Sequence, residues 1–266
     1  MNKLTTVMEN LMLATDTARQ WLDRWDRQQE VYITDREERF AVVADVVQAA
    51  SGRSDPLIVD LGCGPGSLAA RLADRMPGAQ VVGIDADPLL LEMARSAYGD
   101  RPGLRFVEGD LRTPGWHHRL GLDRAPDAIV STTALHWMNR RELARLLREC
   151  AALIRPGGVF VNGDHIEDGD IQPRLDEVTR AVRFGRERRA QAGGAEDWQA
   201  WWQAVETAPE LADLVAARSA AAVEHAKSDT PTISEHVAML RVAGFAEAGA
   251  VWQIGDDRVV VGIAEA

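Results

Sequence analysis

The sequence is poor in cysteine and has no long apolar run. Its 266 residues include two cysteines, Cys63 and Cys150, too few for a disulfide framework or a zinc site built from cysteines. No apolar run reaches the roughly 18 residues of a membrane span, and no basic region followed by an apolar one marks a signal peptide at the N-terminus. We therefore expect a cytoplasmic protein without a membrane partner.

Basic residues are also scarce relative to acidic ones. The chain has 30 basic and 41 acidic residues, a net charge of −11 and an isoelectric point near 5.1. Nucleic-acid-binding proteins place clustered Lys and Arg against phosphates, whereas the richest basic stretch here, residues 183–189, also contains Glu187. The composition thus disfavours nucleic acid as a partner. An apolar content of 46% is typical of a globular protein with a full core.

Strand and helix patterns alternate through the middle of the chain. Apolar, strand-like segments separated by helical patterns occupy residues 57–61, 80–85, 104–108, 128–131 and 159–163. Such alternation predicts a parallel sheet with helices on both faces. Two more strand patterns, 248–254 and 258–264, flank a hairpin turn at 255–257, so the last strand is expected to run antiparallel. We expect a doubly wound α/β fold with a seven-stranded, mostly parallel sheet.

Two helical regions lie outside this alternation. Residues 3–51 have helical periodicity with a break near 31–34, and residues 167–229 are helical without a strand pattern. An insertion at the second place would cover the carboxyl edge of the sheet, where such folds bind ligands. The expected organisation is an N-terminal helical cover, a cofactor-binding core, a helical cap and a C-terminal completion of the sheet, at 1–54, 55–166, 167–229 and 230–266.

A glycine-rich turn follows the first strand pattern. Asp60 precedes Gly62, Gly64 and Gly66, and a helical pattern begins at Ser67. Such a turn lets a ligand approach bare backbone at a helix N-terminus. A nicotinamide fingerprint would place its third glycine where this chain has Ser67, which disfavours an oxidoreductase.

Further motifs follow this turn at regular distances. They are an acid ending the second strand (Asp85) and the segments 107–111, 128–137 and 153–158. Together with the glycine turn they resemble the class I, Rossmann-like S-adenosylmethionine-dependent methyltransferases of small-molecule type. The resemblance covers residues 55–165 closely and 230–266 loosely.

The resemblance implies S-adenosylmethionine as cofactor and S-adenosylhomocysteine as product. Asp60 would meet the ammonium group, Asp85 the ribose hydroxyls and Asp110 the adenine. From their position at the helical break, Tyr32 and Arg36 either close over the cofactor or belong to a segment that only covers one face of the core. The complete set of expected cofactor-binding residues is Tyr32, Arg36, Asp60, Gly62, Cys63, Gly64, Gly66, Asp85, Ala86, Gly109, Asp110, Leu111 and Thr132.

The chemistry of methyl transfer asks for a base only where the acceptor must lose a proton. His136 and His165 follow the fourth and fifth strand patterns, near the expected methyl position, and either could serve, although each also has a purely structural interpretation. We find no acid-acid-Asn set of the metal-dependent catechol type and expect no metal.

A row of tryptophans in the insertion has two interpretations. Trp198, Trp201 and Trp202 lie on one helical face, where they either pack the cap onto the core or, with Trp137, line an apolar acceptor pocket. The expected function is methyl transfer to an oxygen or nitrogen of a small, partly apolar metabolite. The alternatives are carboxymethyl, acid–base or pericyclic chemistry on the same cofactor, or a non-catalytic cofactor-binding protein.

Overall fold

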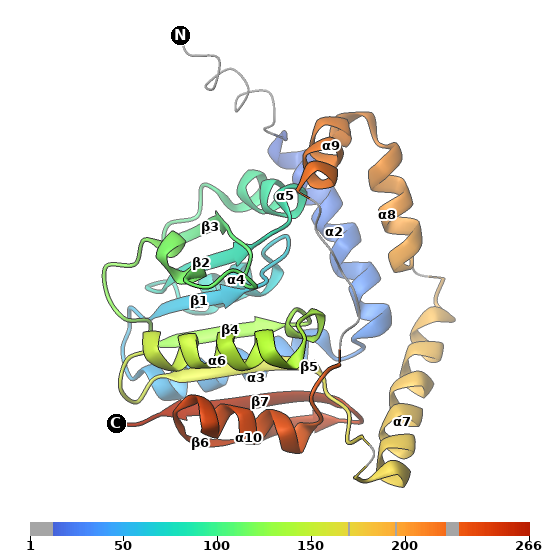
Figure 1. The fold of residues 1–266 in the computed structure, drawn as a ribbon. Coiled ribbons are helices and arrows are strands. Elements are labelled where there is room, and N and C mark those ends of the chain that lie inside the picture. Colours follow the sequence, from blue (N-terminus) through green and yellow to red (C-terminus); the bar gives the residue numbers. More distant parts are fainter. Residues whose placement is uncertain (1–12, 170, 195, 222–228) are drawn as a thin grey trace.

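The computed structural model describes residues 13–169, 171–194, 196–221 and 229–266. A seven-stranded sheet lies at its centre, with strand order β3-β2-β1-β4-β5-β7-β6 (Figure 1). β7 runs antiparallel to both of its neighbours, and the pairs among the first five strands are parallel. The expected fold class is therefore confirmed. The strands are β1 (Leu57–Leu61), β2 (Gln80–Asp85), β3 (Leu104–Glu108), β4 (Ala128–Thr132), β5 (Val159–His165), β6 (Phe245–Ile254) and β7 (Asp257–Ala264).

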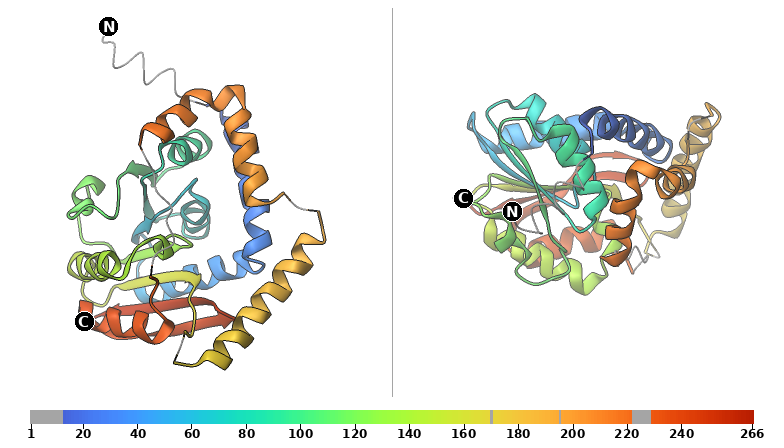
Figure 2. Two further views of the ribbon diagram at one scale, coloured as in Figure 1. Left: turned by 45° about the vertical axis from the view of Figure 1, so that its right-hand side comes forward. Right: turned by 90° about the horizontal axis from the view of Figure 1, so that it is seen from above.

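Helices cover both faces of the sheet. One apolar core joins α3 (Arg36–Ser51), α4 (Ser67–Arg75) and α5 (Pro88–Tyr98) to side chains of one face. A second core packs η1 (Trp116–Leu120), α6 (Arg140–Leu153) and α10 (Ile233–Ala243) on the other. Viewed from above, the sheet lies between these two layers (Figure 2). The layers leave the carboxyl ends of the parallel strands as the edge available to a ligand.

Local signals fix where the helices begin. The Asp87 side chain accepts hydrogen bonds from the backbone N–H groups of Leu89 and Leu90, at 3.0 and 3.3 Å, and Pro88 occupies the first turn of α5. Asn139 and Glu142 form the reciprocal capping box of α6, with bonds of 2.9 and 3.0 Å. Both starts agree with the sequence because each depends on residues within one turn.

The first described helix, α2 (Thr15–Tyr32), runs past the carboxyl edge of the sheet (Figure 1). α2 packs against α5, and the chain then turns through Ile33 and Asp35 into α3. The expected break lies there. Part of the predicted helical region, residues 3–12, lies outside the described residues.

The cap consists of α7 (Pro173–Gln191), α8 (Trp198–Thr207), η3 (Pro209–Leu211) and α9 (Ala212–Ala220). α7 rises from the β6–β7 end of the sheet, and α8 continues along the same side of the molecule past α2 (Figures 1 and 2). α9 returns to α5. Within the described ranges, no helix combines the length and apolarity needed to cross a bilayer.

Candidate active site

A cavity of about 490 Å³ lies between the carboxyl edge of the sheet, α2 and the cap. A smaller hollow of about 110 Å³ adjoins it at Gly62, Asp85 and Trp137. Predicted cofactor residues that line the main cavity are Tyr32, Arg36, Gly62, Cys63, Gly64, Asp85 and Thr132. Those that line the smaller hollow are Gly62, Asp85, Ala86, Gly109, Asp110 and Leu111.

The glycine turn forms the floor where the two hollows meet. Gly62 has φ +64°, and a Cβ placed on it would lie 2.4 Å from the Cβ of Ala134, so no larger residue fits. Gly66 has φ +84°, and a Cβ there would lie 2.7 Å from the Phe106 ring. Gly66 lines neither hollow. The structure therefore corrects its predicted role from cofactor contact to close packing beneath the turn.

Asp85 links the end of β2 to this turn. Its carboxylate accepts a hydrogen bond from the Gly64 N–H at 2.7 Å and another from the Asp87 N–H at 2.9 Å. Burial raises the pKa of Asp85 to about 6, and the backbone donors hold it from rising further. The carboxylate is thus ionised near neutral pH and already oriented toward the cavity it lines.

Asp60 lies elsewhere than predicted. Its side chain is fully buried and lines neither hollow. Because side chains alternate along a strand, Asp60 faces the α3–α4 layer on the same side as Ile58. Burial, followed by the negative charge of Asp85, raises the pKa of Asp60 to about 8, against a smaller lowering by the backbone N–H of Ala69. The predicted contact with the cofactor ammonium therefore needs correction, since Asp60 lies beneath the site.

Arg36 lines the cavity but already has an ionic partner. Its guanidinium donates to Asp26 at 2.8 Å, and Asp26 also accepts from the Ser67 hydroxyl at 2.6 Å. Burial lowers the pKa of Arg36, whereas Asp26 opposes this lowering. Asp26 thereby ties α2 and α3 to the helix that follows the glycine turn. The sequence pattern did not identify Asp26, because its partners are brought together only by the fold.

His136 faces the cavity from η2 (Leu135–Trp137), directly after β4. Its Nδ1 lies 2.9 and 3.0 Å from the two carboxyl oxygens of Asp164 on β5. Burial would raise the pKa of Asp164, but the charge of His136 and its hydrogen bond lower it overall. Asp164 also accepts from the His165 backbone N–H at 2.9 Å, so one buried acid joins both predicted histidines.

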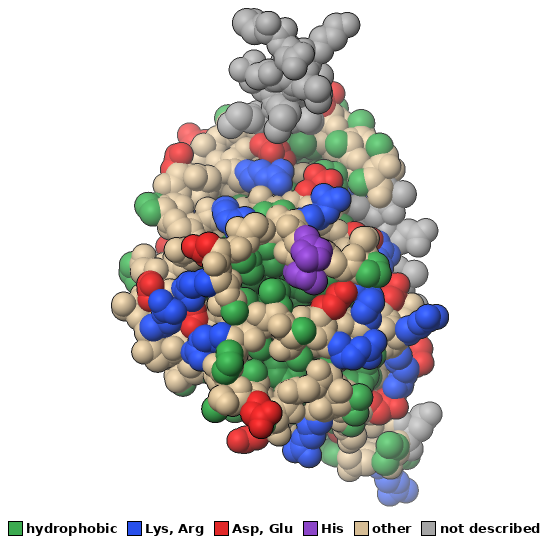
Figure 3. All heavy atoms as spheres, turned by 60° about the vertical axis from the view of Figure 1, so that its left-hand side comes forward, with side chains coloured by type: hydrophobic (Ala, Val, Ile, Leu, Met, Phe, Trp, Pro, Cys, Tyr) green, Lys and Arg blue, Asp and Glu red, His purple; other side chains and the backbone are tan. Residues whose placement is uncertain are grey.

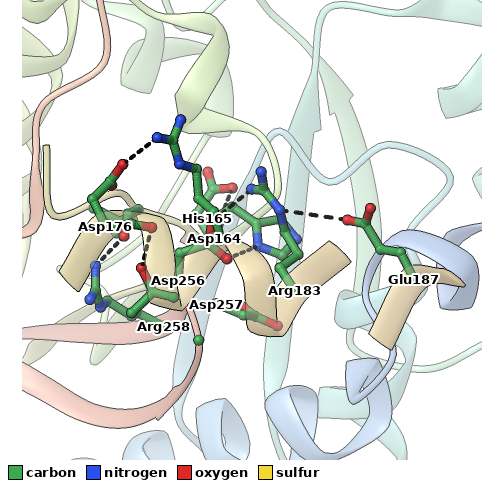
Figure 4. A network of polar contacts seen from close by, with 12 residues as sticks. Asp164, His165, Asp176, Arg183, Glu187, Asp256, Asp257 and Arg258 are labelled. Atoms are coloured by element: carbon green, nitrogen blue, oxygen red, sulfur yellow. Dashed lines mark hydrogen bonds and ion pairs between the residues drawn. The ribbon is translucent and has the colours of Figure 1, made fainter. Parts of the chain in front are cut away.

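His165 lies at the end of β5, between the cavity and the cap. Its Nδ1 is 3.4 Å from Asp256, and the same carboxylate forms an ion pair of 2.9 Å with Arg183 of α7 (Figure 4). Neither buried ring nitrogen of His165 makes a hydrogen bond of normal geometry within the described part of the chain. Since the ring also lines the cavity, its hydrogen-bonding capacity is available to a ligand there.

The cap tryptophans divide into two groups. Trp198 and Trp202 line the cavity, as does Trp137. Trp201 is fully buried, with its ring 4.9 Å from that of Trp25 and outside the cavity lining. Its predicted role in an acceptor pocket is therefore corrected, because docking of α8 on α2 turns this ring into the core.

Several residues of the site carried no sequence signal. Thr133 lines the cavity with φ +51°, and Trp25 and Gln29 reach it from α2. The helical spacing of Trp25 and Gln29 with Trp21 gave an apolar face but not what it covers. Across the described ranges, no group of three or more His, Cys, Asp or Glu side chains is arranged to hold a metal ion.

Residues 58–158 match a family model described as a methyltransferase domain. Proteins named trans-aconitate 2-methyltransferase from Methylobacterium radiotolerans and Azoarcus sp. are each 35% identical to this chain, over 130 and 137 residues. These alignments cover 49% and 51% of this chain and 46% and 49% of the relatives. The chain thus spans about half the length of the curated relatives it matches.

Solved structures of low identity share the fold. A magnesium protoporphyrin IX methyltransferase from Synechocystis, with bound S-adenosylhomocysteine, has a TM-score of 0.55 at 16% identity, covering 92% of this chain and 94% of that one. An O-methyltransferase family protein from Burkholderia thailandensis has a TM-score of 0.53 at 18% identity, covering 92% and 69%. These findings show a methyltransferase domain at residues 58–158 and, with the sheet order, the class I, Rossmann-like fold of S-adenosylmethionine-dependent methyltransferases.

Proposed function

We propose that this protein transfers the methyl group of S-adenosylmethionine to an oxygen or nitrogen of a small, partly apolar acceptor. One observation carries the proposal. The Asp85 carboxylate is joined to the Gly64 N–H at 2.7 Å, on the floor shared by a large cavity and an adjoining hollow. A non-catalytic role is less favoured, because two histidines in contact with acids also face this cavity. The non-methyl chemistries are less favoured, because the curated relatives that match the chain are named methyltransferases.

The residues present fit the cofactor. The glycine floor, where a Cβ at Gly62 would collide with Ala134, leaves bare backbone for a ligand. Asp85 would accept from the ribose hydroxyls, and the hollow lined by Gly109, Asp110 and Leu111 would hold the adenine. When bound, S-adenosylmethionine supplies a methyl group whose bond to sulfur breaks, with the electron pair kept by sulfur, as the bond to the acceptor forms.

His165 is the proposed base for an acceptor that must lose a proton. Its ring nitrogens are buried against the cavity without hydrogen bonds of normal geometry among the described residues, whereas Nδ1 of His136 is engaged with Asp164. Asp256 would stabilise the imidazolium that forms. His136 would orient the acceptor and remains the second candidate for the base.

The test is product analysis with methyl-labelled cofactor and a panel of small acceptors. The proposal predicts that S-adenosylhomocysteine is released in a one-to-one ratio with methylated acceptor. Binding of the cofactor without any such product across oxygen and nitrogen acceptors would favour the alternative chemistries.

A cytoplasmic location and the lack of a nucleic-acid partner stay predictions from the composition. On the face in Figure 3, acidic and basic side chains are interspersed rather than gathered by sign.

A further inference from the structure

Aromatic side chains from four elements line the cavity. The rings that line it come from α2, α3, η2 and α8, and they are Trp25, Tyr32, Phe40, Trp137, Trp198 and Trp202. Trp198 stacks at a tilt on Trp25, with ring centroids 5.4 Å apart, and the Trp198 backbone N–H donates to the Tyr32 hydroxyl at 3.2 Å. These contacts join the cap rings to the α2 rings in one aromatic wall. Walls of this kind favour a flat aromatic guest over a flexible polar one.

Among the described residues, three arginines that line or adjoin the cavity are each paired with an acid. Arg36 pairs with Asp26 at 2.8 Å, and Arg218, which lies over the Trp202 ring, pairs with Asp87 at 2.6 Å. Arg183 pairs with Asp256. Two further acids, Asp85 and Asp164, line or border the cavity. A guest with several carboxylates would therefore lose its hydration without gaining an unpaired cation.

The histidines narrow the acceptor class further. A carboxylate acceptor needs no base, whereas a hydroxyl must give up its proton. His165 faces the cavity, and among the described residues its buried ring nitrogens make no hydrogen bond of normal geometry. An amine would enter as an ammonium ion beside the sulfonium of the cofactor, and the two like charges repel. A phenol enters neutral and becomes anionic only as its proton leaves.

We propose that the acceptor is a neutral aromatic molecule with a phenolic hydroxyl, bound in the cavity against the wall that the α2 and cap rings form together. This inference rests on the proposed function. The phenolic proton passes to His165 as the oxygen–methyl bond forms, so the products are a methyl ether, the thioether S-adenosylhomocysteine and a protonated imidazole. The relatives named for trans-aconitate align with only about half of this chain, and the uncompensated cations that a tricarboxylate needs are not found among the lining residues described above.

The test compares three probes by calorimetry, with and without S-adenosylhomocysteine at pH 7.5. They are 2-naphthol, 2-naphthoate, which matches its shape but carries a charge, and trans-aconitate. We expect 2-naphthol to bind the S-adenosylhomocysteine complex at least tenfold more tightly than either carboxylate. Equal or tighter binding of trans-aconitate, or no binding of 2-naphthol, overturns the acceptor class and leaves the proposed function standing. Failure of S-adenosylhomocysteine itself to bind overturns both.

Variants of a cap ring locate the binding site. Trp198→Leu should weaken 2-naphthol at least fivefold while the dissociation constant of S-adenosylhomocysteine is unchanged, and Trp198→Phe should restore most of the affinity because it keeps a flat ring. Trp252→Leu, on the outer strand β6 and outside the cavity lining, is the matched control. Undiminished 2-naphthol binding by a folded Trp198→Leu protein contradicts the proposed position of the acceptor.

Discussion

The sheet edge and the helical cap face each other across the cavity, and different interactions hold them in place. At the sheet edge, backbone groups dominate, as in the bonds from Gly62 and Cys63 N–H to the Ile84 carbonyl at 2.8 and 3.1 Å. In the cap, side chains do this work, with Arg183 and Arg186 of α7 pairing with Asp256 and Asp35 of the core. A wall made of backbone groups suits a cofactor that is the same in every reaction. A wall held by side chains can be altered by substitution to suit a different acceptor.

The largest effect is expected from substitution of His165, which lies where the sheet edge meets the cap. His165→Gln should lower the rate of methyl transfer to 2-naphthol by about 10²- to 10⁴-fold, because the base is lost. The residual rate should rise with pH, as phenolate forms in solution without the enzyme's help. Single-turnover measurements across pH 6 to 9, with exposed His118→Gln as control, provide the check. If His136→Gln shows the loss instead, His136 is the base.

The sheet wall itself is tested through Asp85. Asp85→Asn should weaken S-adenosylhomocysteine about 100-fold, because charge-assisted hydrogen bonds to the ribose are worth about 3 kcal/mol together. Calorimetry measures this, and circular dichroism checks that the fold is kept. Asp55→Asn is the control, since this exposed acid precedes β1 at the opposite edge of the sheet. Undiminished binding by the Asp85 variant would remove the carboxylate from the cofactor site.

Substitution of Asp60 distinguishes a structural role beneath the glycine turn from direct contact with the cofactor. Because its folded pKa is raised to about 8, the folded protein holds more protons than the unfolded chain between about pH 4 and 8, and Asp60 lowers stability as pH rises through that window. Asp60→Asn should therefore be more stable than the parent at pH 9 by about 2 kcal/mol, with little difference at pH 4.5. Denaturant unfolding gives both values. Loss of S-adenosylhomocysteine binding in the folded variant would restore the direct contact that the sequence predicted.

The raised pKa of Asp85 gives the cofactor site a pH dependence. With a free-protein pKa of about 6, and ribose hydroxyls that need the ionised carboxylate, apparent affinity should fall as pH decreases. S-adenosylhomocysteine should bind about tenfold more weakly at pH 5 than at pH 8. Calorimetric titration at both values, with 2-naphthol binding followed in parallel, measures the change. A constant affinity over this range would contradict the environment described for Asp85.

The smallest effect is expected in the cap. Arg186→Met removes the ion pair with Asp35 and the 2.9 Å hydrogen bond to the Thr34 hydroxyl. Because the pair is partly exposed, we expect a stability loss below about 1 kcal/mol, but a several-fold rise in acceptor KM. Arg101→Met, which removes an exposed pair with Asp74 far along the chain from the cap, should change stability alone. A change in cofactor affinity in the Arg186 variant would mean that the cap contributes to cofactor binding as well as to acceptor binding.

The same difference explains what the sequence predicted. The glycine turn was predicted because it depends on near neighbours, and the Asp87 cap and the Asn139–Glu142 box likewise depend on residues within one turn of a helix. Asp26 and Asp256 act through partners that lie 10 to about 90 residues away in sequence, and no local pattern indicates them. Trp198 and Trp201 share a helical face, yet only docking on α2 decides which ring reaches the cavity.

Thermal unfolding with S-adenosylmethionine, S-adenosylhomocysteine and NAD in parallel tests the central claim most directly. A ligand at about 100 times its dissociation constant adds about 2.7 kcal/mol of stability, which in a chain of this size corresponds to a rise in Tm of about 5–10 °C. We predict that rise with both sulfur compounds and none with NAD. A rise with NAD alone, or no rise with either sulfur compound, would contradict the account of the sheet edge as a wall built for this cofactor.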